Sequence, residues 1–212
     1  MIIDSIQMAI GDTPMLRFTH HQFEEIPKGS AIYAKLEYLN PGGSIKDRLG
    51  AYLIKEGIEQ RKITGNTVII EPTAGNTGIG VAIAAQAAKL STMFVVPEKF
   101  SLEKQELMRA LGAKIVHTPT EKGIKGAIAE AKRLHEERPN SYLPLQFDNP
   151  ANPEAYYHTL GPELVKDLGS SITSFVAGIG SGGTFSGVAR YLLKHVPSIR
   201  LIGVELSLIH IL

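Results

Sequence analysis

Residues 67–90 read TVIIEPTAGNTGIGVAIAAQAAKL, and this stretch decides the fold. It opens with a short apolar run, Thr67–Ile70, in which β-branched residues dominate. It continues through a turn rich in proline and glycine into an alanine-rich segment, Thr77–Leu90, that is long enough for a helix. Short β-branched runs favour strands, whereas longer apolar runs of good helix formers favour helices. The stretch therefore predicts a strand that leads through a tight loop directly into a helix.

The same alternation extends to both sides of this stretch. Strand-like runs lie at Ala31–Leu36, Thr67–Ile70, Thr92–Val96, Lys114–His117, Ser174–Ala177 and Arg200–Val204. Helical patterns lie at Lys46–Gln60, Thr77–Leu90, Ser101–Leu111, Ile124–Glu136, Glu154–Leu168 and Thr184–His195. Such alternation is typical of βαβ units, whose strands run parallel. We predict an α/β fold with parallel sheets flanked by helices.

Composition narrows the classes of partner. Lys and Arg number 22 against 21 Asp and Glu, a formal net charge of +1 that argues against a nucleic-acid-binding surface. Cysteine is absent, which rules out disulfides and thiolate metal sites, and the seven histidines show no ligand spacing. No apolar run has the length of a membrane span, and the first residues do not resemble a signal peptide. We expect a cytoplasmic protein that acts on small molecules, without a metal, nucleic acid or membrane partner.

The first loop with chemical information reads NPGGSIKDR over residues 40–48. Its proline and glycines predict a tight turn, after which Ser44 can cap a helix that starts near Lys46. A lysine in the first helical turn lies at the positive end of the helix dipole, which lowers the pKa of its amine. Such an amine is suited to Schiff-base chemistry. Lys46 is therefore a candidate nucleophile, although a solvated surface lysine would give the same pattern.

The second loop reads PTAGNTG over residues 72–78 and directly follows the strand predicted at Thr67–Ile70. Backbone N–H groups at a strand-to-helix turn form an anion site that suits a carboxylate. Asn76 adds an amide that can bond to a ring substituent. An ordinary helix start would show the same residues, so the loop alone decides nothing.

The third loop reads GSGGT over residues 180–184, between a predicted strand and a predicted helix. Glycines let the backbone approach an anion closely, and the hydroxyls of Ser181 and Thr184 add donors at the helix N-terminus. Phosphate is the natural ligand. The lysine of a P-loop does not follow, which disfavours nucleoside triphosphate hydrolysis. A glycine turn that binds nothing is the alternative.

One small molecule satisfies all three loops. Pyridoxal 5′-phosphate (PLP) has an aldehyde for Lys46 and a phosphate for the glycine loop, and the amino acid that it activates brings a carboxylate for the second loop. Ligands of open α/β sheets bind beyond the carboxyl ends of the strands, where such loops gather. We therefore predict PLP as the cofactor.

With these loops in this order, the chain resembles the fold type II PLP enzymes of the cysteine synthase (O-acetylserine sulfhydrylase) and cystathionine β-synthase family, which share the tryptophan synthase β-like architecture. Further matching segments are IGDTP at residues 10–14, QFDNPANP at 146–153 and VE at 204–205. The resemblance implies two lobes, and the proline-rich stretch 138–153 is interpreted as a crossing between them. The implied parts are an N-terminal segment of the large lobe, a small lobe, and the start of the large lobe, at residues 1–39, 40–150 and 151–212.

The resemblance also implies roles for individual residues. Lys46 would hold the cofactor covalently and remove the α-proton of the substrate, and Asn76 would bond the 3′ oxygen of the cofactor. The residues implied for the phosphate are Gly180, Ser181, Gly182, Gly183 and Thr184. Those implied for the substrate carboxylate and its cleft are Thr73, Ala74, Gly75, Thr77, Gln146 and Phe147.

The activity that the resemblance implies is β-replacement on O-acetyl-L-serine or L-serine. The sulfur nucleophile would be sulfide or homocysteine, giving L-cysteine or cystathionine, and the enzyme would be a homodimer. Ala74 stands where most family members have serine, which removes a donor and leaves the preferred substrate pair open. Where the family continues with a long C-terminal portion, this sequence ends in LSLIHIL at 206–212. We therefore expect residues 1–212 alone to lack part of the large lobe and to be unstable or inactive.

Two alternatives remain open from sequence. GIGSGG at residues 178–183 satisfies the dinucleotide fingerprint G-x-G-x-x-G, and Glu205 follows about 20 residues on, where an acid that binds ribose belongs. This pattern would indicate an NAD(P)-binding oxidoreductase, but it leaves the loops of Lys46 and Asn76 without a role. The second alternative is a non-catalytic module that binds PLP or an amino acid.

Overall fold

The computed structural model describes residues 2–73 and 75–205, so Ala74 and the tail 206–212 lie outside the described residues. The helices are α1 Lys46–Glu59, α2 Asn76–Ala87, α3 Leu102–Ala110, α4 Gly123–Glu136, α5 Ala151–His158, α6 Leu160–Leu168 and α7 Gly183–His195. The strands are β1 Met15–Thr19, β2 Ala31–Lys35, β3 Val68–Pro72, β4 Ser91–Pro97, β5 Lys114–Thr118, β6 Ser141–Tyr142, β7 Ser174–Gly178 and β8 Arg200–Val204. Short 3-10 helices η1–η4 span Ile6–Ala9, Glu37–Leu39, Thr120–Lys122 and Gly169–Ser171.

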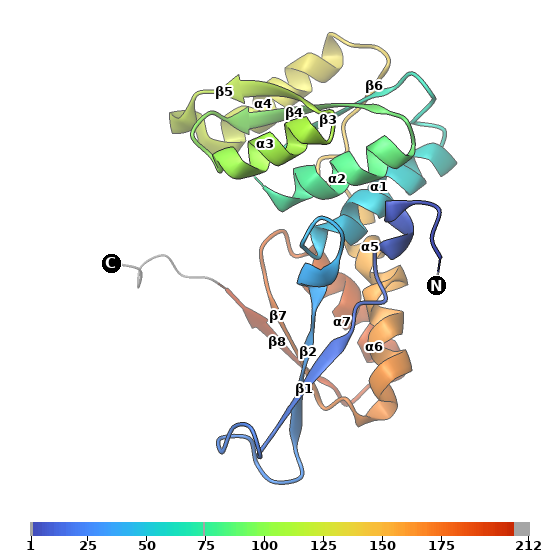
Figure 1. The fold of residues 1–212 in the computed structure, drawn as a ribbon, viewed down its shortest axis with the longest axis vertical. Coiled ribbons are helices and arrows are strands. Elements are labelled where there is room, and N and C mark those ends of the chain that lie inside the picture. The colour runs from blue at the N-terminus through green and yellow to red at the C-terminus, as the bar shows by residue number, and fades with distance from the viewer. Residues whose placement is uncertain (1, 74, 206–212) are drawn as a thin grey trace.

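The largest sheet has the order β5-β4-β3-β6 with all pairs parallel, which confirms the prediction for this region. Successive residues of a strand point to opposite faces of the sheet. Accordingly, Ile69 joins the apolar cluster that includes α2, whereas Ile70 packs with Ala127 and Ala131 of α4. Figure 1 shows helices on both sides of this sheet. Burial on both faces explains why the strands lack polar alternation.

The remaining strands correct part of the prediction. β7 and β8 pair in parallel, as expected, but β2 pairs antiparallel with β1, which the sequence analysis missed. The connecting residues 20–30 show no helical pattern, and a returning strand without a crossover helix must run antiparallel. The two-residue strand β6 was also missed, since it lies inside the proline-rich stretch 138–153. The proposed division of the chain into lobes stays a prediction.

The single helix predicted at Glu154–Leu168 is wrong, because the structure has α5 and α6 with a break at Thr159. Pro162 has no N–H to bond the carbonyl of His158, and its ring would clash with that carbonyl in a continuous helix. The first helix therefore ends at His158. α5 also begins earlier than predicted, where the side chain of Asn149 accepts the backbone N–H of Ala151 at 2.9 Å.

Helices α1 and α2 approach each other closely at two glycines. A Cβ added at Gly50 would lie 2.2 Å from the carbonyl carbon of Gly80, and one added at Gly80 would lie 2.4 Å from the carbonyl oxygen of Lys46. Any larger side chain at either position would push the helices apart. The start of α1 is therefore held against α2, and this contact places Lys46 near the loop that opens α2.

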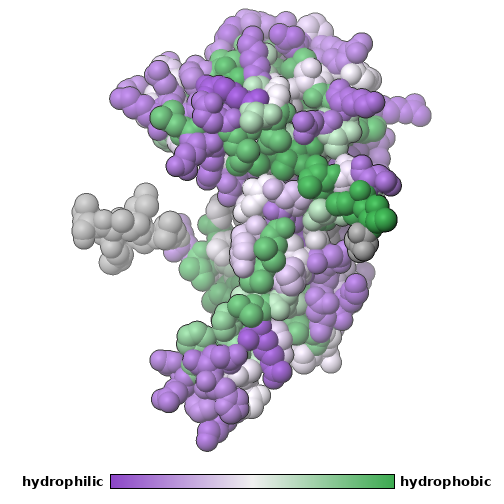
Figure 2. All heavy atoms as spheres, in the orientation of Figure 1, coloured by the Kyte–Doolittle hydropathy of each residue, from purple (hydrophilic) through white to green (hydrophobic). Residues whose placement is uncertain are grey.

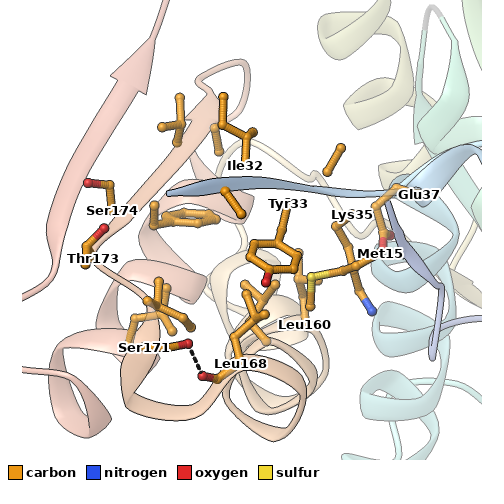
Figure 3. Close-up of a pocket in the computed structure, with 18 of the residues that line it drawn as sticks. Met15, Ile32, Tyr33, Lys35, Glu37, Leu160, Leu168, Ser171, Thr173 and Ser174 are labelled. Atoms are coloured by element: carbon orange, nitrogen blue, oxygen red, sulfur yellow. Dashed lines mark hydrogen bonds between the residues drawn. The ribbon is translucent and has the colours of Figure 1, made fainter. Parts of the chain in front are cut away.

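An apolar cavity of about 550 Å³ lies between β2 and β7 (Figure 3). Met15, Tyr33 and Leu160 contribute to its walls, which also include Phe175 and Val176 of β7. In Figure 2, apolar side chains gather beneath the β5-β4-β3-β6 sheet, where Figure 1 shows α1 and α2, and along β7–β8. Within the described residues, no helix combines the length and apolar character needed to cross a membrane.

Candidate functional site

The three loops meet around one cavity of about 570 Å³. The sequence-predicted residues that line it are Lys46, Thr73, Gly75, Thr77, Gln146, Phe147, Gly180, Ser181, Gly182 and Thr184. Ile45 and Ile124 also line it and were missed, because apolar wall residues have no distinctive motif. Gly178, the first glycine of GIGSGG, lines it too but was not assigned to the site. The structure thus brings together residues separated by up to 139 positions in the chain, from Ile45 to Thr184.

Lys46 is the first residue of α1, where the sequence predicts it. The preceding turn closes with a hydrogen bond from the N–H of Gly43 to the carbonyl of Asn40 at 2.8 Å, and Gly43 takes a left-handed φ of +77°. The hydroxyl of Ser44 accepts the backbone N–H of Lys46 at 3.2 Å. The Lys46 amine lies 3.4 Å from the hydroxyl oxygen of Ser181, and burial lowers its pKa. A buried amine of lowered pKa is a better nucleophile at neutral pH.

The second loop is organised by Thr73. Its hydroxyl oxygen accepts the N–H groups of Gly75 at 3.2 Å and Gly78 at 3.1 Å. Thr77 donates its hydroxyl to the side-chain oxygen of Gln146 at 2.8 Å, so these two residues hold one wall of the cavity together. Asn76 begins α2 but is exposed and does not line the cavity. Its contact with the cofactor stays a prediction.

Glu71 is a buried acid that the sequence analysis missed. Its carboxylate accepts the backbone N–H groups of Leu145 at 2.9 Å and Gln146 at 3.2 Å, and so fixes the backbone that carries Gln146. Burial raises its pKa to about 7, although the two N–H donors act in the opposite direction. A signal was available, because a glutamate directly follows the apolar run Thr67–Ile70 and precedes the loop. Buried acids in this position usually have partners.

The raised pKa of Glu71 predicts a dependence of stability on pH. A carboxyl group with a pKa near 4.5 in the unfolded chain and about 7 in the folded chain binds its proton more tightly when folded. The free energy of unfolding should therefore fall as pH rises from about 4.5 to 7. Glu71→Gln should flatten this fall, as measured by urea unfolding between pH 5 and 8. An unchanged pH profile in the variant would contradict the assignment.

The third loop opens α7. Gly182 has a left-handed φ of +79° directly before the helix. A Cβ added at Gly180 or Gly182 would meet no heavy atom within 4 Å, so this backbone faces open space. Gly183 differs, because it lines an adjoining hollow and a Cβ there would lie 1.9 Å from the side-chain oxygen of Asn152.

A buried ion cluster lies beside the start of α1. The guanidinium of Arg48 bonds both carboxylate oxygens of Glu37, each at 2.8 Å, and both oxygens of Glu163. Lys35 adds a second cation 2.8 Å from Glu163. Burial alone would raise the pKa of Glu163, but the hydrogen bonds from Arg48 and Lys35 outweigh it and lower the pKa to about 2. The cluster ties α1 to η2 and α6, two residues away from Lys46.

The residues that line the cavity fit PLP. The aldehyde needs an amine of lowered pKa, which Lys46 supplies, and the phosphate needs donors that small residues leave accessible. The open space at Gly180 and Gly182 and the hydroxyl of Ser181 meet the second need at a helix N-terminus. The cavity volume lies in the range of small-molecule sites.

Comparison with known proteins identifies the class. A family model described as "Pyridoxal-phosphate dependent enzyme" matches residues 6–210, so the chain belongs to this family and PLP is its cofactor. The chain is 65% identical over 205 residues to a protein named cysteine synthase from Helicobacter pylori, covering 97% of this chain and 67% of that protein. A Bacillus subtilis protein named O-acetylserine dependent cystathionine beta-synthase is 51% identical, with coverage of 96% and 66%.

A solved structure supports the fold. The O-acetylserine dependent cystathionine beta-synthase of Helicobacter pylori matches with a TM-score of 0.91 and 64% identity, covering 96% of this chain and 66% of that one. The expected fold class, that of fold type II PLP enzymes, is therefore confirmed, and the NAD(P)-binding alternative is set aside. The chain spans about two thirds of the length of these relatives.

Proposed function

We propose that this site serves a β-replacement in which a sulfur nucleophile takes the place of the substituent on O-acetyl-L-serine or L-serine. The observation that carries the proposal is the meeting of the Lys46 amine, the Thr73–Thr77 loop and the glycine loop around one cavity. The names of the relatives support this reaction class, since they are called cysteine synthase and O-acetylserine dependent cystathionine beta-synthase. The products would be L-cysteine or cystathionine.

Each group of residues has a separate task in this reaction. When bound, PLP withdraws electrons from the substrate and so acidifies its α-carbon. The amine of Lys46 holds the cofactor and then accepts the α-proton as general base. Thr73, Gly75, Thr77 and Gln146 bind and orient the substrate carboxylate, and the residues of the glycine loop hold the phosphate. Phe147 and Ile124 add apolar surface to the cavity wall.

Product identification tests the function. PLP-loaded protein is incubated with O-acetylserine or serine, with sulfide and homocysteine offered in competition. The assay uses residues 1–212 and a second form in which the last third of the Helicobacter pylori cysteine synthase follows residue 205. We expect cysteine or cystathionine from the extended form and little from residues 1–212. PLP binding without either product in both forms would favour the non-catalytic module and overturn the proposal.

Thr77→Val should weaken substrate binding specifically. Valine keeps the shape of threonine but removes the hydroxyl, which donates to Gln146 at 2.8 Å in the free site and would turn to the substrate carboxylate on binding. A hydrogen bond to a charged group contributes about 1.5–3 kcal/mol. The KM for O-acetylserine should therefore rise roughly 10- to 100-fold, with PLP affinity unchanged. Thr92→Val, a buried threonine of β4 that does not line the cavity, is the control. Equal KM values in the two variants would exclude Thr77 from the carboxylate site.

We further propose that the enzyme is a homodimer and works in the cytoplasm. Exposed apolar side chains near the N-terminus, at Ile2, Ile6 and Met8, offer a surface that a second copy could cover. Light scattering after size-exclusion chromatography of the extended form tests the dimer, and a monomeric mass would contradict it.

A further inference from the structure

Asn152 connects two parts of the cavity wall that are distant in sequence, the segment of Gln146 and the glycine loop of Ser181. It is the second residue of α5 and only 2% exposed. Its amide nitrogen donates to the backbone carbonyl of Gln146 at 2.8 Å and to the hydroxyl oxygen of Ser181 at 3.0 Å. Gln146 therefore bonds Thr77 through its side chain and Asn152 through its backbone carbonyl, and Asn152 in turn bonds Ser181. These bonds join the opening of α2 to the loop before α7.

The chemistry of these partners fixes which way each hydrogen points. A backbone carbonyl only accepts, so the group of Asn152 that faces Gln146 must be the NH₂. The other hydrogen of the same NH₂ then reaches Ser181, whose oxygen accepts it. The Lys46 amine, 3.4 Å from that oxygen, is a second donor. Lys46 gives up this contact when it holds the cofactor, but the bond from Asn152 remains, so the hydroxyl hydrogen of Ser181 is left to donate elsewhere.

The other half of the Asn152 amide faces α7. Its oxygen is buried without a hydrogen-bond partner among the described residues, against the Cα of Gly183. Burial of an unpaired oxygen is costly, and a serine or aspartate would not reproduce both donated bonds. The NH₂ group of Asn152 therefore makes both of its side-chain contacts with the site.

We propose that Asn152 is a positioning residue that keeps the Ser181 hydroxyl as a hydrogen-bond donor toward the phosphate of the cofactor. The inference rests on the proposed assignment of residues 180–184 to the phosphate. It assigns to Asn152 no contact with the cofactor. Its effect passes through Ser181, which lines the cavity.

The test compares PLP with pyridoxal, which has the same ring and aldehyde but no phosphate. Dissociation constants of both are measured on the extended form, and the preference is the ratio of the pyridoxal value to the PLP value. Schiff-base formation at Lys46 contributes to both ligands and cancels. Asn152→Asp should lower the preference about 10- to 100-fold, because a carboxylate would accept a hydrogen bond from the Ser181 hydroxyl and so turn it away from the phosphate. An equal loss of affinity for both ligands would mean a merely structural role and would overturn the proposal.

A double-mutant cycle separates the hydroxyl from the added charge. Ser181→Ala alone should lower the preference, and Asn152→Asp should then cost about tenfold less in the alanine background. Equal costs in both backgrounds would overturn the proposal, since charge alone would explain them. Should Asn152→Asp fail to fold by circular dichroism, Asn152→Ala enters the same cycle, with a smaller expected loss and the same criterion.

The matched control is Asn140→Asp. Asn140 also donates its amide to a backbone carbonyl, that of Asn66 at 3.0 Å, but it does not line the cavity. Its preference should equal that of the wild type. A wild type without preference for PLP would contradict the phosphate assignment itself, whereas a preference that survives in every Asn152 variant would contradict the present inference alone.

Discussion

Lys46→Ala is expected to abolish covalent attachment of the cofactor. After borohydride reduction, peptide mapping should find PLP on Lys46 in the wild type and on no peptide of the variant. The amine lies in the cavity 3.4 Å from Ser181, and its lowered pKa favours the neutral nucleophilic form. Since the same amine would act as general base, turnover by the extended form should fall about 10²- to 10⁴-fold or more.

Lys55→Ala is the control for this experiment. Lys55 lies on the same helix, but its side chain is 68% exposed and pairs with Glu59 at 3.8 Å on the surface. It should keep labelling and turnover near the wild-type level. If Lys46→Ala remained as yellow as the wild type with PLP, the assignment of the amine and the proposed function would both be wrong.

Arg48→Met should destabilise the fold more than any other change considered. The guanidinium is 1% exposed, and methionine would leave the carboxylates of Glu37 and Glu163 without their main partner. Removal of one member of a buried ion pair typically costs about 3–5 kcal/mol. For a chain of this size the midpoint of thermal unfolding should fall by on the order of 10 °C. Differential scanning calorimetry at pH 7 measures it.

Arg133→Met provides a matched comparison. Arg133 also contacts two glutamates, Glu130 and Glu137, but its side chain is 50% exposed. Water and salt screen exposed pairs, so the midpoint of thermal unfolding of Arg133→Met should change little. Equal effects of the two substitutions would refute the importance of burial.

Acid unfolding should bring the stabilities of the wild type and Arg48→Met closer together. The pKa of Glu163 is about 2 when folded, below its ordinary value of 4.5. The stability that the pair contributes is therefore present above about pH 4.5 and is lost as pH falls toward 2. The difference between wild type and Arg48→Met should shrink over this range. A constant difference would mean that Glu163 is not paired as described.

Strand and helix positions followed from sequence because local periodicity determines them. The strand at Arg200–Val204 is confirmed at both ends, and most other elements differ by a few residues. The errors come from longer-range effects. Pro162 ends a helix four residues before itself, and the direction of β2 depends on a connection without a helix. Both signals were present but need neighbouring elements for their interpretation.

For the candidate site too, features that depend on local sequence were predicted, and features that depend on distant residues were missed. Loops rich in glycine, with Lys46 and Thr77, stand out because their chemistry depends on local sequence. Glu71 and Asn152 do not, since each acts through a backbone or side chain distant in sequence, such as the hydroxyl of Ser181. Glu71 follows an apolar run and Asn152 lies within QFDNPANP, but neither pattern identifies the groups that these residues position. Only the folded chain places them.

The break at Thr159 allows α5 and α6 to contact two different parts of the molecule. Before it, α5 delivers an amide to the glycine loop; after it, α6 delivers a carboxylate to the ion cluster. In a single continuous helix, one rotation about the helix axis would have to direct Asn152 to Ser181 and also Glu163 to Arg48. Because of the break, the orientation of each helix can change independently. Substitutions in α5 can therefore alter the surroundings of Ser181 while the contact of Glu163 with Arg48 of α1 is kept.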